Sequence, residues 1–305
     1  MSTLRSVTAP APAAPPLPPA IAAWFEGRGW RMRRHQWDML AMARAGRHAL
    51  LVADTGAGKT LAGFLPTLCD FAGDARPGEG LHTLYVSPLK ALAQDVKRNL
   101  LTPIEDMGLP IRVETRSGDT PSDRKKRQRE KPPHILLTTP ESLSLLLSYP
   151  ESAELFAGLS RVVIDEVHAF ATDKRGDLLA LSLARLNALA PQAQRVALSA
   201  TLANPRDFQE WLSPQSGDDG EIAAAALVIG EEGADPHVEI LLPQEERVPW
   251  GGHAGRWAVP QLYEAIKANR TTLVFTNTRF LAEFIFQCLW EANEDHLPIG
   301  IHHGS

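Results

Sequence analysis

Short apolar runs alternate along most of the chain with longer stretches whose apolar residues recur at helical spacing. The apolar runs predict strands at 49–53, 82–87, 111–115, 134–138, 161–165 and 195–199. The amphipathic stretches predict helices at 21–48, with a break at Gly27-Arg28-Gly29, and at 59–71, 89–101, 122–130, 141–148 and 177–190. Strands that alternate with helices predict a parallel sheet covered on both faces, which binds its ligands beyond the carboxyl ends of the strands.

The pattern changes towards both ends of the chain. Residues 1–20 are rich in Ala and Pro and are expected to form a disordered tail. The alternation weakens after residue 203, and Pro249-Trp250-Gly251-Gly252 predicts a linker at 246–256. Beyond it, a helix at 257–269, a strand at Thr271–Thr276 and a helix at 280–292 predict a new α/β unit. We therefore expect a first domain over 21–245 and an incomplete second domain over 257–305.

The composition is typical of a globular protein and does not suggest a membrane-spanning or disulfide-rich one. The hydrophobic content of 44% and charged content of 22% are ordinary for a globular protein. No apolar run approaches the length of a membrane span, and the two cysteines, Cys69 and Cys288, do not suggest a disulfide framework. The net charge of −5 gives no general attraction for nucleic acid, so polyanion binding requires local basic surface. We expect a cytoplasmic protein without a membrane partner.

The most informative segment is the phosphate-loop pattern at 53–60, between a predicted strand and a predicted helix. Backbone N–H groups of the loop and the helix N-terminus favour phosphate there. Lys59 is expected to reach the β- and γ-phosphates, and the Thr60 hydroxyl to bind Mg²⁺. The nucleotide-binding residues are expected to be Thr55, Gly56, Ala57, Gly58, Lys59 and Thr60. Taken alone, the segment also fits a Gly-rich turn with a solvated lysine.

Two adjacent carboxylates end the apolar strand at 161–165. Asp165 is expected to hold Mg²⁺ through water, and Glu166 to orient and deprotonate an attacking water. Solvated acids at the start of a loop are the alternative for the pair alone. The phosphate loop upstream makes the catalytic interpretation much stronger, with Lys59, Asp165 and Glu166 as the catalytic set.

Several further segments fall in a fixed order around these two. They are 33–36, 87–92, 115–120, 138–143, 198–201, 273–279 and 302–305. The ordered series resembles the superfamily 2 DExH-box helicases and, within them, the Lhr (large helicase-related) group. It is most similar to the bacterial ligase-associated DEXH-box DNA helicases, thought to work in DNA repair.

The resemblance covers about residues 18–305, and it implies an architecture and an activity. The fold would be a RecA-like P-loop NTPase domain followed by a truncated second RecA-like domain. The activity would be that of a helicase or translocase that hydrolyses ATP with Mg²⁺ while moving along single-stranded or partly duplex DNA. A DNA ligase and a nuclease of the same repair pathway would be its partners.

The resemblance also assigns roles to individual residues. Gln36 would read adenine, for which a carboxamide offers both a donor and an acceptor. His168, Ser199 and Thr201 would couple the ATP site to the nucleic-acid site. The residues that would grip the nucleic-acid backbone are Pro88, Lys90, Arg116, Gly118, Thr139, Pro140, Asn277 and Arg279.

Three questions stay open at this level. The basic segment 124–131 either extends the nucleic-acid contacts or forms a solvated charged helix. Backbone contacts do not separate DNA from RNA, so an RNA helicase is an alternative. The family's arginine fingers lie in the later part of the second domain, and no residue can be assigned that role. A nucleotide-binding module without turnover is therefore the main alternative to a working helicase.

Overall fold

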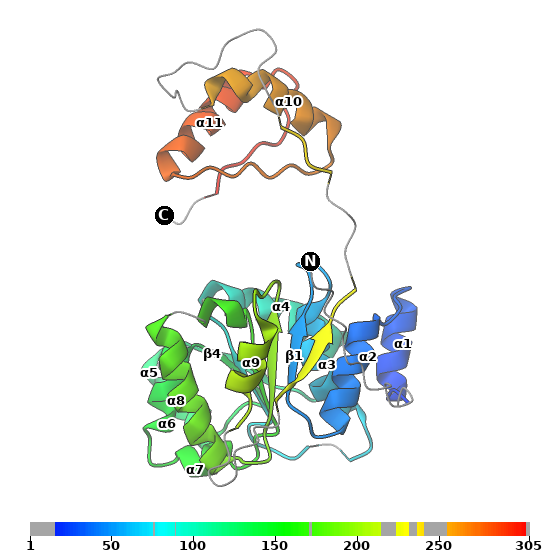
Figure 1. Cartoon of the computed structure of the whole chain (residues 1–305), viewed down its shortest axis with the longest axis vertical. Coiled ribbons are helices and arrows are strands. Elements are labelled where there is room, and N and C mark those ends of the chain that lie inside the picture. The colour runs from blue at the N-terminus through cyan, green and yellow to red at the C-terminus, as the bar shows by residue number, and fades with distance from the viewer. Residues whose placement is uncertain are drawn as a thin grey trace. The chain divides into compact units, whose positions relative to one another are not determined.

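The computed structural model describes residues 16–75, 77–88, 90–170, 173–214, 224–231, 237–240 and 255–302. The chain divides into two compact units, Met1–Gly233 and Ala234–Ser305 (Figure 1). The first described helix begins at Pro19, slightly before the expected start of order at Ile21. Residues 1–15 of the expected tail and most of the expected linker lie outside the described residues, so the domain boundaries stay a prediction.

A seven-stranded sheet organises the first unit. Its strands are β1 (Ala49–Val52), β2 (Thr83–Val86), β3 (Val113–Arg116), β4 (Ile135–Thr138), β5 (Arg161–Ile164), β6 (Gln194–Ser199) and β7 (Ala226–Ile229). Their order in space is β3-β4-β2-β5-β6-β1-β7, and all pairings are parallel. All carboxyl ends therefore lie along one edge of the sheet, which we call the carboxyl edge.

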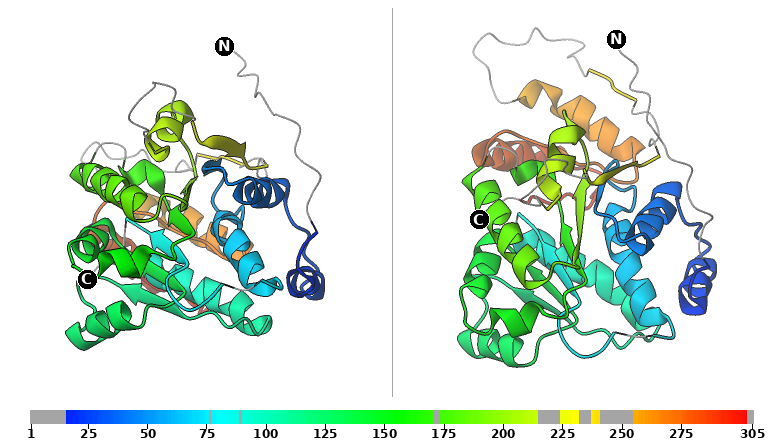
Figure 2. Two further views of the ribbon diagram at one scale, coloured as in Figure 1. Left: turned by 90° about the horizontal axis from the view of Figure 1, so that it is seen from below. Right: turned by 60° about the horizontal axis from the view of Figure 1, so that its bottom comes forward.

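Helices cover both faces of this sheet, because successive strand residues point to opposite sides. Leu51, Val163 and Leu198 share one apolar core with α1–α4, while Leu50, Val162 and Ala197 share the other with α6–α9. The helices are α1 (Pro19–Gly27), α2 (Arg34–Arg44), α3 (Lys59–Ala72), α4 (Lys90–Asp106), α5 (Ser122–Glu130), α6 (Pro140–Leu147), α7 (Ser152–Phe156), α8 (Lys174–Leu189) and α9 (Pro205–Leu212). Figure 2 shows the blue helices and the green helices on opposite sides of the strands.

The expected strands and helices of the first unit are confirmed, with small shifts at their ends. The helix expected at 89–101 continues to Asp106. The short helices α7 and α9 and the strand β7 were not expected. In β7, Leu227 and Ile229 are exposed and only Val228 is well buried, because the strand lies at the sheet edge. An edge strand of this kind leaves little apolar pattern in the sequence.

The second unit contains the 3₁₀ turn η2 (Arg256–Ala258) and the helices α10 (Val259–Ala268) and α11 (Arg279–Glu291). Apolar residues of the two helices pack together, including Tyr263 and Leu289. The expected strand at Thr271–Thr276 was wrong: Leu273 and Phe275 are 76% and 89% exposed, and the segment pairs with no other described segment. A β-branched run favours extended backbone, but a strand also needs a neighbour to bond.

None of the described helices is both long enough and apolar enough to cross a lipid bilayer.

Candidate active site

Three neighbouring strands bring the predicted catalytic segments together. The strands β5, β6 and β1 are neighbours in the sheet. Strand β5 is followed by Asp165 and Glu166, β6 ends at Ser199, and β1 leads into the loop at 53–58. Because the strands are parallel and adjacent, all three segments emerge side by side at the carboxyl edge. The fold thus assembles one site from positions that are far apart in the sequence.

Glycines fix the shape of the phosphate loop. Gly56 and Gly58 have φ values of 82° and 79°, a left-handed region that disfavours other residues. Gly58 is also the N-cap residue of α3, and a Cβ atom there would lie 3.2 Å from Nε2 of Gln36. A side chain at position 58 would therefore meet both backbone strain and a close neighbour.

Lys59 is held inside the loop that it follows. Its Nζ donates to the carbonyl oxygens of Ala53 at 2.7 Å and of Asp54 at 3.0 Å, and the residue is only 8% exposed. Carbonyl oxygens are weaker partners for an ammonium group than phosphate oxygens are. A nucleotide polyphosphate would therefore compete effectively for this amine.

Ala53 occupies the first loop position, where the usual pattern has Gly, and its neighbour compensates for the extra methyl group. A Cβ atom on Gly230 would lie 2.3 Å from Cβ of Ala53, and the Gly230 N–H donates to the carbonyl of Val52 at 2.7 Å. Gly230 therefore provides the space that the alanine takes. Sequence reasoning missed Gly230, because it lies far downstream at the end of β7.

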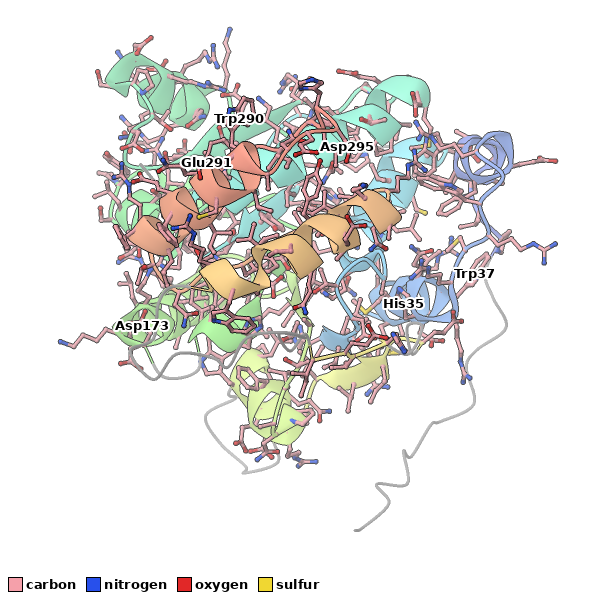
Figure 3. All side chains as sticks on the ribbon, turned by 90° about the horizontal axis from the view of Figure 1, so that it is seen from above. His35, Trp37, Asp173, Trp290, Glu291 and Asp295 are labelled. Carbon is pink, nitrogen blue, oxygen red and sulfur yellow. The ribbon has the colours of Figure 1, made fainter. Side chains whose placement is uncertain are left out.

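The helix α2 contributes two buried side chains to the loop. Nε2 of His35 lies 3.0 Å from the carbonyl oxygen of Ala57, so the neutral ring carries its proton on Nε2. Burial lowers the pKa of His35, and the Ala57 hydrogen bond opposes that effect only in part. The backbone N–H of Arg33 donates to Oε1 of Gln36 at 3.0 Å. Figure 3 labels His35 on α2. Sequence reasoning assigned no role to His35, although this residue stands next to the expected adenine-reading glutamine.

Asp165 is buried at the end of β5 and is held by two donors. The Tyr85 hydroxyl donates to Oδ2, and the Glu166 N–H donates to Oδ1 at 2.9 Å. Burial raises the pKa of Asp165 above its ordinary value, and the two hydrogen bonds and the charge of Lys59 offset that rise only in part. Sequence reasoning missed Tyr85, because tyrosine in a buried strand is usually a packing residue.

A polar chain connects the second acid to the end of β6. Nδ1 of His168 lies 3.4 Å from Oε2 of Glu166 and 3.0 Å from Oγ of Ser199, which donates to the carbonyl of Thr201 at 3.1 Å. The Ser199 hydroxyl donates its proton to the Thr201 carbonyl, so its oxygen is free to accept a hydrogen bond from Nδ1–H of the imidazole. The three expected coupling residues therefore do meet. Glu166 has a φ of 47°, an uncommon conformation for glutamate that redirects the chain after Asp165.

The remaining expected contacts of the first unit lie along the other half of the carboxyl edge. Pro88 follows β2, Gly118 follows β3, and Thr139 follows β4 as the N-cap residue of α6, which begins at Pro140. Lys90 begins α4, and its side chain lies outside the described set. The strand order β3-β4-β2 thus places these positions beside the catalytic half.

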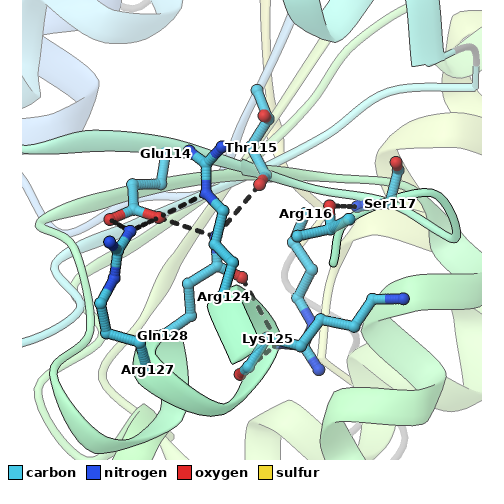
Figure 4. A network of polar contacts seen from close by, with 9 residues as sticks. Glu114, Thr115, Arg116, Ser117, Arg124, Lys125, Arg127 and Gln128 are labelled. Carbon is cyan, nitrogen blue, oxygen red and sulfur yellow. Dashed lines mark hydrogen bonds and ion pairs between the residues drawn. The ribbon is translucent and has the colours of Figure 1, made fainter. Parts of the chain in front are cut away.

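Arg116 differs from its expected role. The residue is 1% exposed, and its Nη1 donates to the carbonyl of Lys125 at 2.9 Å, so its side chain joins β3 to α5 (Figure 4). Its position does not suit direct contact with a phosphate backbone at the surface. The resemblance implied a contact with the nucleic-acid backbone for Arg116, but the turn into α5 covers its side chain.

The cations of α5 are also engaged within the protein. Arg124 and Arg127 both donate to Glu114, at 3.2 Å and 2.9 Å, and Lys125 donates to the carbonyl of Gly118 at 2.7 Å (Figure 4). Of the two interpretations of this basic segment, the contacts favour a charged helix braced against β3.

Two expected contacts belong to the second unit. Asn277 is exposed, and Arg279 is the first residue of α11, where its Nε lies 3.0 Å from Oε1 of Glu283. The hydroxyl of Thr278 between them caps the helix by accepting from the Leu281 N–H at 3.2 Å.

Comparisons with known proteins agree with this arrangement. A family model described as DEAD/DEAH box helicase matches residues 33–208. The chain is 38% identical over 283 residues to the Lhr helicase/probable uracil glycosylase of Mycolicibacterium smegmatis, covering 87% of this chain and 18% of that protein. It is 35% identical over 277 residues to the ATP-dependent helicase Lhr-Core of Methanothermobacter thermautotrophicus, covering 86% of this chain and 32% of that protein.

A solved structure of Mycobacterium smegmatis helicase Lhr, bound to ssDNA and AMP-PNP, superimposes with a TM-score of 0.73 and 34% identity. The match covers 95% of this chain and 38% of that one. The chain thus spans between about one fifth and one third of the two curated relatives. The family model covers more than half of the chain and includes both the phosphate loop and the acid pair. The chain belongs to the DEAD/DEAH box helicase family.

Proposed function

We propose that this chain is the ATP-binding motor part of an ATP-dependent helicase or translocase that acts on single-stranded DNA. The observation that carries the proposal is the convergence of the phosphate loop, the acid pair and Ser199 on three adjacent strands. A structural loop or a pair of solvated acids would not require the polar chain that runs from Glu166 through His168 to Ser199.

The residues suit ATP with Mg²⁺. Mg²⁺ prefers hard oxygen ligands and is usually held by one or two carboxylates together with substrate phosphates. Thr60 and Asp165 would supply a hydroxyl and a carboxylate of that kind. Among the described residues no group of three acidic, histidine or cysteine side chains could hold a metal alone, which fits a metal that arrives with its nucleotide. When bound, the ion would neutralise negative charge on the phosphates.

Side chains of this chain would bind the phosphates, activate the attacking water and couple hydrolysis to nucleic-acid binding. Lys59 would bind the terminal phosphates in place of the Ala53 and Asp54 carbonyls. Glu166 would hold the attacking water and take its proton. His168 and Ser199 would couple a change at Glu166 to the residues that contact nucleic acid along the carboxyl edge.

Single-stranded DNA is the favoured track, with RNA as the alternative. The Mycobacterium smegmatis neighbour was solved with ssDNA and AMP-PNP, and its likeness extends over nearly all of this chain. A role in DNA repair beside a ligase and a nuclease stays a prediction from the sequence, as does a cytoplasmic location.

The test is ATP hydrolysis by the full chain with and without single-stranded DNA, compared with Glu166→Gln. We expect DNA-stimulated hydrolysis that the substitution abolishes, while AMP-PNP still binds. Binding of AMP-PNP without hydrolysis in the unsubstituted chain would favour a nucleotide-binding module without turnover. Full hydrolysis by Glu166→Gln would contradict the role given to Glu166.

A further inference from the structure

Two helices begin side by side at the carboxyl edge. The helix α6 follows Thr139, and α8 follows its N-cap residue Asp173, which Figure 3 labels. The two helices pack against each other along the same face of the sheet. Their first turns therefore lie next to Thr139 and Pro140, two of the proposed nucleic-acid contacts.

An arginine–glutamate pair joins these first turns. Nε of Arg175 lies 2.5 Å from Oε1 of Glu141, and Nη2 lies 3.2 Å from Oε2, so the guanidinium meets the carboxylate with two contacts. The two side chains are 32% and 51% exposed. Pairs as exposed as this contribute little to stability. The fork that binds a carboxylate in this way binds a phosphate equally well.

The backbone of Arg175 is fixed by its neighbours. A Cβ atom on Gly176 would lie only 2.0 Å from the carbonyl oxygen of Phe170, so the glycine allows α8 to begin against the 3₁₀ turn η1 (Val167–Phe170). That turn directly follows the acid pair. The Arg175 N–H also donates to the Asp173 carboxylate at 3.5 Å. The guanidinium therefore reaches the first turn of α6 from a helix start that packs directly against η1.

Comparison with α5 shows what is unusual about this pair. Glu114 is 19% exposed and accepts from Arg124, Arg127 and Gln128, as expected of an internal brace. Glu141 is much more exposed; it receives one guanidinium, and the Thr139 hydroxyl and its own backbone N–H also donate to it. Because Glu141 is more exposed and binds one guanidinium rather than two, an incoming anion could take its place on the arginine more easily than it could take the place of Glu114.

We propose that Arg175 is a phosphate-binding residue of the nucleic-acid site and that Glu141 holds its guanidinium in place until a backbone phosphate competes for it. The inference rests on the proposed function, binding of single-stranded nucleic acid along this edge. It adds a contact from the start of α8, where the sequence analysis named no nucleic-acid-binding residue.

The proposal predicts opposite effects from the two partners. Binding of labelled oligo-dT to the full chain is measured by fluorescence anisotropy over a range of salt concentrations. Arg175→Gln should weaken binding severalfold and reduce the slope of log K against log salt by about 0.7, the value for one phosphate contact on a single strand. Glu141→Gln removes the competing carboxylate and should tighten binding.

The matched control is Arg185→Gln, which removes an exposed arginine from the far half of the same helix. Thermal melts identify any variant that fails to fold, and Arg175→Lys then replaces Arg175→Gln as the test. Weaker binding by both Glu141→Gln and Arg175→Gln would show a structural brace and overturn the inference. So would an Arg175 variant that behaves like Arg185→Gln. If the unsubstituted chain does not bind oligo-dT, the proposed function itself fails, and the inference fails with it.

Discussion

Nε2 of His35 lies 3.0 Å from the carbonyl oxygen of Ala57, so a helix that precedes the sheet reaches into the phosphate loop. The contact is fully buried, and Nδ1 of the same ring has no hydrogen-bonding partner among the described residues. The imidazole therefore gives one directed hydrogen bond to a loop whose shape determines how phosphate is bound.

Replacement of His35 by Ala should damage both the fold and the site. The Ala57 carbonyl would lose its partner in a buried place, which costs about 1–3 kcal/mol of unfolding free energy. AMP-PNP should also bind more weakly. His35→Gln keeps an N–H donor and should recover part of both losses. Denaturant unfolding and calorimetric titration measure them, and an Ala variant with unchanged stability and affinity would contradict this role.

Gly58→Ala should destabilise the phosphate loop by more than the cost of placing an alanine in a left-handed conformation. A left-handed alanine costs about 1–2 kcal/mol, and the added Cβ would also press on Gln36. Gly29→Ala is the matched control, because Gly29 has a φ of 65° and nothing within 4 Å of the added atom. We expect Gly58→Ala to lose AMP-PNP affinity and Gly29→Ala to keep it. Equal losses of stability in the two variants would show that the contact with Gln36 is unimportant.

Gly230→Ala should be rescued in part by a substitution in the phosphate loop. The added methyl would lie 2.3 Å from Cβ of Ala53, and overpacking of this kind costs about 1–3 kcal/mol. Ala53→Gly removes the opposing methyl group, so the double variant should be more stable than Gly230→Ala alone. The rescue should be incomplete, because the added atom would still lie 3.0 Å from Cα of Ala53. A double-mutant cycle of unfolding free energies measures the coupling, and strictly additive effects would contradict it.

Acid should destabilise the first unit through His82. Burial, and next the charge of Arg161, lower the pKa of His82 to about 4. The folded state then binds fewer protons than the unfolded state between the ordinary histidine pKa of about 6.5 and the lowered one. Stability is therefore lost as the pH falls through this window.

Denaturant midpoints between pH 7 and pH 4.5 test this expectation. His82→Gln should reduce the dependence on pH, whereas His302→Gln, at an exposed position, should leave it unchanged. A pH dependence that is the same in the His82 variant would assign the effect to other groups.

The parallel sheet and the meeting of the phosphate loop with the acid pair could be predicted from the sequence, because both depend on local signals, while the catalytic roles stay a prediction. The loop at 53–60 and the acids at 165 and 166 follow apolar runs, and a parallel sheet brings such ends together. The partners of these residues could not be predicted in the same way. Tyr85 and Gly230 look like packing and turn residues until the fold places them against Asp165 and Ala53.

The errors have the same origin. The resemblance placed Arg116 on the nucleic-acid backbone, but its burial depends on the path of α5, which the motif does not report. The run Thr271–Thr276 has the composition of a strand, yet pairing is a property of two segments rather than one. Arg175 has no motif of its own, and only the packing of α6 against α8 brings it to Glu141.

The contact between Gly230 and Ala53 also has a mechanical consequence. The chain leaves the sheet through β7, and Glu231, the next residue, accepts a hydrogen bond from the Arg34 N–H at 3.3 Å. The end of β7 therefore lies against both the strand that leads into the phosphate loop and the first turn of α2. A substitution at this one point would disturb the support of the loop and of the helix together.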